Sequence, residues 1–313
     1  MIDLSIVIVS FNTRDLLRNC LTSVAAGGGN LEVETFVVDN ASADGSPDMV
    51  EREFPSVRLI CNDVNRGFAA ANNLAIEQAT GRYLLLLNSD TEVQHDALRT
   101  LVRFMDQHPN AGYCGPRLIN PDGSHQPSAR RFPTVLSGAY SLLGLAGRRP
   151  ESKHTLDLHA SHSDRGEFRS GWLCGACVVV RAETARQVGL LDEGFFLYFE
   201  ETDWCKRMAG AGWEGWFVGS AEVMHLGGQS VDSNGPAQPF SGDHPVHWVN
   251  SRRRYMRRYH GLPGMLLANA IEIVLYAAIW IRHSWRRGQR NRTKAQSAAR
   301  AIRYMLAAPT ATS

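Results

Sequence analysis

The sequence predicts an α/β protein built on a doubly wound, mostly parallel sheet, with a basic helical extension at its C-terminal end. Apolar runs of strand length alternate with segments of helical periodicity over residues 4–107. The runs are apolar throughout, as expected of strands covered on both faces. Polar clusters follow three of them, at 10–12, 39–42 and 88–90. Because the carboxyl ends of parallel strands share one edge, where such sheets bind ligands, we expect these clusters to form a site.

The expected elements follow in chain order. We expect strands at 4–9, 34–38, 57–61 and 83–87, and helices starting near Thr13, near 46–54, and at 67–79 and 97–107. Asn12 or Thr13 would cap the first helix. A long connection covers 120–170, and ordered structure returns at 172–181. We divide the chain into an α/β domain at 1–235 and a tail at 236–313.

The charge of the chain is unevenly distributed. The 313 residues are 44% apolar and 20% charged, as in ordinary globular proteins. The net charge is +2, but residues 248–313 hold 13 Lys plus Arg and one acid, Glu272. The remainder has 20 basic and 30 acidic residues. The basic tail indicates an anionic partner, either lipid or nucleic acid, although a solvated basic helix would have the same composition.

The apolar part of the tail, residues 262–281, is long enough to span a bilayer. It contains Asn269 and Glu272, and a central charge disfavours spanning by about 2.5–3.5 kcal/mol. We therefore favour a helix in the membrane interface, with the basic residues of 248–303 on anionic lipid. The alternatives are a spanning helix, a helix packed on the α/β domain, or one that pairs two subunits in a homodimer.

The six cysteines are scattered along the chain. The first apolar run is short and follows Asp3, so we expect no secretory signal and a cytoplasmic protein with reduced thiols. Cys174 and Cys177 have the spacing of a redox motif or of half a zinc site. No second pair accompanies them and a strand-like run follows, so we interpret them as buried structural residues.

Two carboxylates at strand ends are candidates for ligand binding. Asp39 could accept hydrogen bonds from a base or a ribose hydroxyl, or it could form an Asx turn. Asp90 offers the hard oxygen that a divalent metal prefers, or it could cap the next element. The chain has no Walker loop and no GxGxxG after its first strand. A metal and specific side chains would then have to neutralise any phosphates.

An acidic cluster and one histidine complete the candidates. Glu200, Glu201 and Asp203 follow five nonpolar residues, and an apolar setting can tune a carboxylate for general-base work. Acids are also favourable at a helix start, and the two interpretations are compatible. His225 stands alone, which by itself is more typical of a structural histidine.

The order and spacing of several segments resemble the family 2 glycosyltransferases of the GT-A fold over residues 4–230. The matching segments are SIVIVSFN (5–12), VVDNAS (37–42), NRGFAAANN (65–73), LLLLNSD (84–90), GLLDEGFFLYFEETDWCKRM (189–208) and AEVMHLGG (221–228). PDGSHQPSARRFPT (121–134) and SRRRYMRRYHG (251–261) resemble a bacterial rhamnosyltransferase branch that includes enzymes acting on polyprenyl-diphosphate-linked sugars.

The resemblance implies a binding site for a nucleotide-sugar. Its residues would be Ser10, Phe11, Asn12, Asp39, Asn65, Gly67, Phe68, Asn72, Asn88 and Ser89. Asp90 and His225 would hold Mg²⁺ or Mn²⁺. Asn88 stands where the family has the first acid of its D-x-D motif, so Asp90 alone remains of that pair.

The resemblance also implies an inverting transfer. Glu201 takes the position of the catalytic base, Glu200 is the second candidate, and Asp203 would orient the local structure. Arg130 and Arg131 would bind phosphate of the donor or acceptor, or would be plain surface charge, and Trp172 would line the acceptor site.

The expected donor is dTDP-rhamnose, and the expected acceptor is a lipid-linked sugar or a glycan of cell wall or polysaccharide biosynthesis. A galactofuranosyl or N-acetylhexosaminyl transferase that uses a UDP-sugar is the alternative. A non-catalytic protein that binds nucleic acid or lipid is the alternative from another class. The apolar run of the tail is more typical of lipid contact, so we expect no nucleic-acid partner. A degenerate, non-catalytic member of the family is a further alternative, and the joint presence of Asp39, Asp90, Glu201 and His225 argues against it. We expect the enzyme to lie peripherally on the inner face of the membrane.

Overall fold

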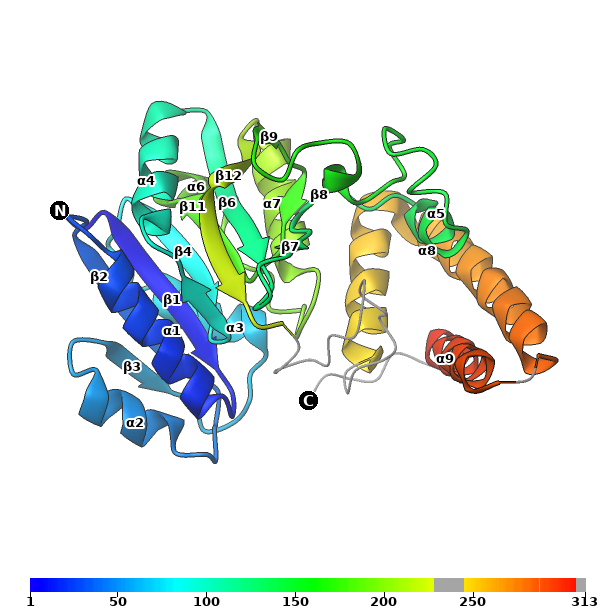
Figure 1. Cartoon of the computed structure of the whole chain (residues 1–313), viewed down its shortest axis with the longest axis horizontal. Helices are drawn as coiled ribbons and strands as arrows, with labels where there is room; N and C mark the ends of the chain where they lie inside the picture. Colours follow the sequence, from blue (N-terminus) through cyan, green and yellow to red (C-terminus); the bar gives the residue numbers. More distant parts are fainter. Residues whose placement is uncertain (228–244, 287, 308–313) are drawn as a thin grey trace.

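The computed structural model describes residues 1–227, 245–286 and 288–307, and these form an α/β domain followed by helices (Figure 1). The strands are β1 (Leu4–Ser10), β2 (Val33–Asp39), β3 (Arg58–Cys61), β4 (Tyr83–Asn88), β5 (Thr91–Val93), β6 (Ala111–Ile119), β7 (His125–Gln126), β8 (Ala129–Arg130), β9 (Glu167–Arg169), β10 (Trp172–Leu173), β11 (Cys177–Arg181) and β12 (Glu214–His225). The helices are α1 (Arg14–Gly27), α2 (Ser46–Glu53), α3 (Phe68–Ile76), α4 (Ala97–Gln107), α5 (Ser137–Leu142), η1 (Leu158–Ala160), α6 (Ala182–Val188), α7 (Glu200–Gly210), α8 (Pro245–Ser284) and α9 (Gln289–Leu306).

The main sheet confirms the predicted fold class. Its strand order is β3-β2-β1-β4-β11-β6-β12-β5, with β7 and β9 attached to β6 and β12. Strands β3, β2, β1 and β4 are mutually parallel, and so are β6 and β12. Strand β11 runs antiparallel between β4 and β6. The ordered stretch expected at 172–181 is two strands, because residues 174–176 turn the chain out of β10 before β11 begins.

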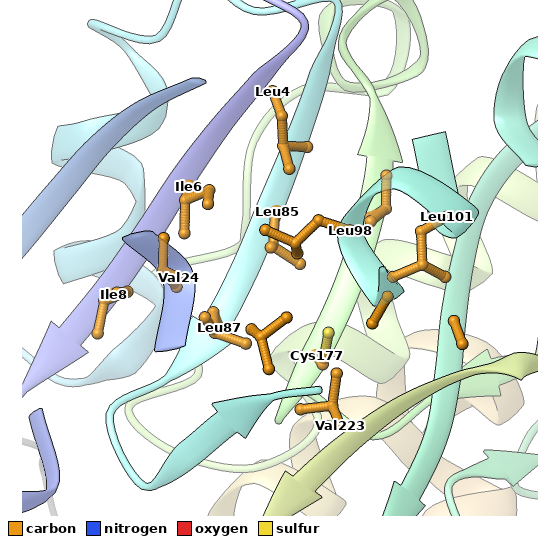
Figure 2. Close-up of a cluster of buried hydrophobic side chains, with 14 of the residues drawn as sticks. Leu4, Ile6, Ile8, Val24, Leu85, Leu87, Leu98, Leu101, Cys177 and Val223 are labelled. Carbon is orange, nitrogen blue, oxygen red and sulfur yellow. The ribbon is translucent and has the colours of Figure 1, made fainter. Parts of the chain in front are cut away.

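The central strands bury side chains on both faces, which explains why they are apolar throughout. On one face Ile6 and Ile8 of β1 and Leu85 of β4 pack with residues of α1, α2 and α4; Figure 2 shows this cluster, with Val24 of α1 among its labelled side chains. On the other face Val7 and Leu86 pack with residues of α3, α6 and α7. The alternation follows from the two-residue period of a strand.

The connection expected at 120–170 holds the short elements β7, β8, α5, η1 and β9. Strand β7 pairs with β6, and β8 pairs with β10 in a separate two-stranded sheet. Beyond β8 the chain leaves the α/β domain and reaches α8 through α5. This segment therefore links the sheet to the C-terminal helices (Figure 1).

The tail begins as part of the α/β domain's packing rather than as a separate appendage. The expected domain boundary at 235/236 lies outside the described residues. The first half of α8, residues 245–260, buries Tyr255 and Met256 against Phe195. Ser251 Oγ donates a hydrogen bond to the carbonyl of Leu197 at 2.8 Å. This half of α8 thus contacts the segment that precedes α7.

Helix α8 is kinked at Gly261, whose φ of 67° and ψ of 177° are not helical. A positive φ is a conformation that glycine adopts without steric cost. Both halves of α8 pack against α9. Val249, before the kink, joins Ala301 and Met305 of α9 in a small core, and Ile273 and Tyr276, beyond the kink, pack against this core. By length and composition, α8 from Val246 to Ser284 could cross a membrane, although one such helix is weak evidence of a span.

The polar residues within the apolar part of α8 face protein. Arg252 donates to Asn269 Oδ1 at 2.6 Å and forms a buried ion pair with Glu272. Gly138 of α5 lies so close that a Cβ there would stand 1.8 Å from Glu272 Oε1. We expected the charge of Glu272 to disfavour a membrane-spanning helix. In the structure Arg252 neutralises this charge inside the protein.

We predict that Arg252→Leu lowers the free energy of unfolding by about 3–5 kcal/mol, because it leaves the Glu272 carboxylate buried without its partner. Urea unfolding followed by circular dichroism measures this change. The double variant Arg252→Leu/Glu272→Leu removes both charges and should recover most of the loss. If the single and double variants lose the same free energy of unfolding, the loss comes from packing and not from the unpaired charge.

Candidate functional site

The three polar clusters predicted at strand ends come together in the structure. Ser10 at the end of β1 lies opposite Asp39 at the end of β2, and Val9 lies opposite Asn88 of β4. The hydroxyls of Ser10 and Thr13 are 3.0 Å apart, and those of Thr13 and Ser89 are 2.9 Å apart. These buried hydrogen bonds join the loops after β1 and β4 into one edge.

Asp39 presents an unused acceptor at this edge. Its side chain is 2% exposed, and its Oδ2 accepts a hydrogen bond from the Ser42 amide at 2.8 Å. Its Oδ1 is buried and has no hydrogen-bond partner among the described residues. Asn12 holds the adjacent loop, because its Oδ1 accepts from the Ala43 amide. Buried polar atoms are rarely left unpaired, so Asp39 Oδ1 indicates a ligand that donates an N–H or O–H group.

Phe11 and Asn88 belong to the neighbouring strand ends, after β1 and at the end of β4. Phe11 is 46% exposed in the loop after β1, so its ring is accessible to a ligand. The backbone of Asn88 is engaged on both sides: its amide donates to Ala176 and its carbonyl accepts from the Thr91 hydroxyl.

Asn40 organises the neighbouring loop 62–67, and sequence reasoning missed it. Its Nδ2 donates to Asn65 Oδ1 at 2.8 Å, and its Oδ1 accepts from Asn62 Nδ2 at 3.0 Å. Asn65 Oδ1 also accepts from the Gly67 amide. The available signal was an amide directly after Asp39, followed by two asparagines at the next strand end.

Gly67 and Phe68 hold this loop against the segment before α7. Gly67 has a φ of 81°, and a Cβ at this position would lie 2.5 Å from the Phe196 carbonyl oxygen. The Phe68 amide donates to that same oxygen at 2.8 Å. Asn72 is buried in α3, where its Nδ2 donates to the Phe68 carbonyl, and its Oδ1 has no partner among the described residues.

Asp90 and His225 face one another, as a shared metal ion would require. Residue 90 directly precedes β5, and β5 pairs Thr91 with His225 at the end of β12. His225 Nε2 lies 3.4 Å from Asp90 Oδ1, and the side chains are 13% and 4% exposed. His225 Nδ1 lies 2.6 Å from Gln126 Oε1. Carboxylate oxygen and imidazole nitrogen suit Mn²⁺, and carboxylate suits Mg²⁺.

The pair fits a cation that also binds a ligand. Among the described residues, no group of three or more His, Cys, Asp or Glu side chains could hold a metal ion. Two protein ligands leave most positions of a six-coordinate ion to phosphate oxygens and water, as is usual where a metal is bound with a nucleotide.

The acidic cluster stands at the start of α7, after two aromatic residues in a left-handed conformation. Tyr198 and Phe199 have φ values of 70° and 67°, which is unusual for bulky residues. Burial raises the pKa of Glu201 to about 7. Burial, followed by the charge of Glu201, raises the pKa of Glu200 well above its ordinary value. An Oε2 atom of each carboxyl is buried without a partner among the described residues.

Glu201 and Asp90 both lie near Cys174. Burial is the main cause that raises the pKa of this thiol, and the charges of Glu201 and Asp90 raise it further. The side chain of Glu201 packs beside Gly175, in the turn between β10 and β11. Burial also raises the pKa of Cys177. The two thiols are free and protonated, in keeping with a structural interpretation of this cysteine pair.

Asp203 is fully buried and engaged by three side chains. Its Oδ2 accepts from Arg207 Nε at 2.9 Å, and its Oδ1 accepts from the Tyr259 hydroxyl at 2.8 Å. Arg258 lies 3.2 Å from Oδ1. These contacts tie α7, the helix that carries Glu201, to α8.

The two arginines of the 120–134 segment differ in their surroundings. The Arg131 guanidinium donates to the carbonyls of Pro150 and Thr155 and so holds the connection together. Arg130 lies over the ring of Trp172, with its guanidinium carbon 5.8 Å from the ring centroid. Its charge acts to lower the pKa of Glu201, against the larger effect of burial. Arg130 and Trp172 therefore lie on the Glu201 side of the site.

Comparisons with known proteins identify the family. The sequence model described as Glycosyl transferase family 2 matches residues 5–163. An N-acetylglucosaminyl-diphospho-decaprenol L-rhamnosyltransferase of Mycobacterium tuberculosis (strain H37Rv) is 28% identical over 303 residues, covering 93% of this chain and 97% of that protein. The rhamnosyltransferase WbbL of Escherichia coli K12 is 25% identical over 230 residues, covering 70% and 82% of the two chains.

Two solved structures share the fold. GalNAc-T7 with UDP, GalNAc and Mn²⁺ aligns with a TM-score of 0.58 at 14% identity, over 98% of this chain and 56% of that one. The mannosyltransferase PcManGT of Pyrobaculum calidifontis, in complex with GDP-Man and Mn²⁺, aligns with a TM-score of 0.56 at 16% identity, over 96% and 85%. At these identities the likeness establishes the fold, which is that of GT-A glycosyltransferases.

We predict that Gly67→Ala destabilises the protein more than Gly123→Ala. Both glycines have a φ near 80°, which costs an alanine about 1–2 kcal/mol, but no atom lies within 4 Å of a Cβ at Gly123. The clash with Phe196 should add about 1–3 kcal/mol at Gly67. Thermal unfolding of the two variants measures the difference in stability. Equal losses of stability would show that the loop at Gly67 accommodates the added methyl group without a further loss of free energy.

Proposed function

We propose a specific reaction for this chain, which belongs to glycosyl transferase family 2 and is therefore a glycosyltransferase. The reaction is the inverting transfer of L-rhamnose from dTDP-rhamnose to a hydroxyl of a polyprenyl-diphosphate-linked or polysaccharide acceptor of the cell envelope. The mycobacterial relative, whose name gives a rhamnosyl transfer to a lipid-linked sugar, supports this choice because the alignment covers nearly all of both chains. The observation that carries the mechanism is Glu201, whose Oε2 is buried without a partner among the described residues and whose charge acts, with that of Asp90, on the Cys174 thiol between β10 and β11.

The donor is held at the edge formed by β1, β2 and β4. Asp39 Oδ1 accepts a hydrogen bond from the base or the ribose, and Phe11 offers an exposed ring in the loop after β1. Asp90 and His225 would hold Mg²⁺ or Mn²⁺. That ion, when bound, supplies positive charge against the diphosphate leaving group. The structural neighbours solved with Mn²⁺ support a divalent ion, although they do not decide which one this chain uses.

Glu201 acts as the base on the acceptor. It accepts the proton of the acceptor hydroxyl while the hydroxyl oxygen bonds to the anomeric carbon and the bond from that carbon to the diphosphate oxygen breaks. A single displacement inverts the configuration at the anomeric carbon. Arg130, stacked on Trp172, is suited to a phosphate of the acceptor because a guanidinium binds phosphate in a bidentate manner.

The segment 262–285, which comprises the distal half of α8 and Trp285 directly after it, supports association with a membrane surface. Its exposed large apolar side chains, here called the apolar stripe, are Leu262, Leu266, Leu267, Val274, Trp280, Ile281 and Trp285. At 3.6 residues per turn, those that belong to α8 lie on one side of the helix. Exposed basic residues flank this stripe at the end of α8 and on α9: Arg282, Arg286, Arg292, Lys294, Arg300 and Arg303. The combination suits a helix in the interface of an anionic leaflet, where a lipid-linked acceptor would be found.

We predict that dTDP-rhamnose binds with Mn²⁺ more tightly than UDP-galactose, UDP-galactofuranose or UDP-GlcNAc in isothermal titration calorimetry, and that chelation weakens binding. Asp39→Asn should weaken it about tenfold or more, because a hydrogen bond to a charged group contributes about 1.5–3 kcal/mol. Asp63→Asn, an exposed change in the neighbouring loop, is the control. Selective binding of a UDP-sugar would show that this UDP-sugar, and not dTDP-rhamnose, is the donor. If the folded protein binds none of these donors, the proposed reaction is contradicted.

We predict that Glu201→Gln lowers the transfer rate by about 10²–10⁴-fold, the usual contribution of a general base, with a smaller loss for Glu200→Gln. The base must be ionised, so the wild-type rate should rise with pH through about 7, the pKa of Glu201. Rates measured from pH 5 to 9 test both statements. A larger loss in Glu200→Gln than in Glu201→Gln would transfer the role of base to Glu200.

We predict that Val274→Gln weakens binding to vesicles of mixed zwitterionic and anionic lipid about tenfold, because a buried valine contributes roughly 1.5 kcal/mol or more. Val64→Gln is the matched control, since Val64 and Val274 are 66% and 67% exposed. Sedimentation with vesicles measures both variants. Unchanged binding of Val274→Gln would rule out this face, and binding that resists high salt and alkaline extraction would indicate a spanning helix instead.

A further inference from the structure

The hairpin at residues 120–126 contacts the candidate metal pair through one side chain, and the proposed reaction does not use it. Strand β7 carries Gln126, which pairs with Leu118 of β6. The Gln126 Oε1 atom lies 2.6 Å from His225 Nδ1. The other imidazole nitrogen, Nε2, faces Asp90 Oδ1 at 3.4 Å. Gln126 therefore touches the side of His225 opposite the carboxylate.

A chain of hydrogen bonds gives Gln126 a defined orientation. An ionised Asp122 carboxylate can only accept, and it accepts from the Ser124 hydroxyl at 2.5 Å. The Ser124 oxygen then accepts from Asn120 Nδ2 at 2.9 Å. Asn120 Oδ1 in turn accepts from Gln126 Nε2 at 3.1 Å. Each bond sets the direction of the next, so the amide of Gln126 turns its Oε1 toward His225.

This direction determines the tautomer of His225. Because Gln126 Oε1 can only accept, His225 Nδ1 carries the hydrogen, and the lone pair of the neutral ring lies on Nε2. That lone pair and Asp90 Oδ1 then face one another, which is unfavourable unless a positive charge lies between them. The two ligand atoms are thus oriented before an ion arrives.

We propose that Gln126 is a positioning residue, which fixes His225 in the Nδ1–H tautomer so that Nε2 and Asp90 Oδ1 bind a divalent cation together. The hairpin 120–126 serves as the support of the metal site. This inference rests on the proposed metal dependence and adds a residue that acts on the ion through another side chain. Loss of such a partner usually costs about 10–100-fold in metal affinity.

The test measures the affinity for Mn²⁺ by electron paramagnetic resonance of the free ion, with dTDP present and no transfer required. Gln126→Leu removes the acceptor and should bind Mn²⁺ about 10–100-fold more weakly than wild type. Gln126→Glu keeps an oxygen acceptor for Nδ1–H and should retain most of the affinity. Gln94→Leu is the matched control, because Gln94 follows β5 and its Nε2 donates to the Glu92 carbonyl. Its affinity should equal that of wild type.

The outcomes separate this inference from the reaction on which it rests. Wild-type affinity in Gln126→Leu, or an equal loss in Gln126→Leu and Gln126→Glu, would overturn the role of Gln126 and leave the metal site standing. A wild-type protein that binds no Mn²⁺ with dTDP would overturn both. If Gln126→Leu does not fold, ¹⁵N NMR spectra of histidine-labelled wild type with Mg²⁺ and dTDP determine the tautomer of His225. The spectrum of His225→Gln identifies the signals of this residue. Protonation at Nδ1 supports the inference, and protonation at Nε2 overturns it.

Discussion

The buried carboxylate of Asp203 is the constraint that holds the C-terminal helices to the α/β domain. A charge removed from water is tolerated only where its partners are well placed. Its partners here come from α7 itself and from α8, through Arg207, Tyr259 and Arg258. The start of α7, where Glu201 stands, and the first half of α8 are therefore held in one position. The C-terminal helices are in this way part of the catalytic domain's architecture.

The candidate site is defined by groups that the protein leaves unsatisfied. Asp39 Oδ1 and Glu201 Oε2 are buried without partners among the described residues, and the Asp90–His225 pair turns two potential ligand atoms toward each other. Other buried polar atoms without a partner, such as Thr184 Oγ1 and the Tyr255 hydroxyl, are scattered through the described residues and do not gather at one edge. Unpaired groups are costly for stability, so the position of those in the candidate site at the carboxyl edge of the parallel strands is best explained by binding.

Sequence reasoning succeeded where local pattern determines structure. The buried strands carry apolar runs, and α4 begins and ends at the predicted residues 97 and 107. The meeting of 10–12, 39–42 and 88–90 followed from parallel topology alone. It failed where partners are distant in sequence. The pairing of Glu272 with Arg252, twenty residues away across a kink, has no local signal in the sequence and was not predicted.

The non-helical conformation of Gly261 has a geometric consequence for the reaction. The part of α8 before it is attached to α7, and the part after it carries the apolar stripe. If that stripe rests on a bilayer, the angle at Gly261 sets the height of Glu201 above the lipid. Glu201 then reaches only an acceptor hydroxyl that lies at the same distance from the lipid. The number of sugars between that hydroxyl and the membrane would therefore determine whether it can react. Chain length of the acceptor, and not sugar identity alone, would then decide which step of assembly this protein performs.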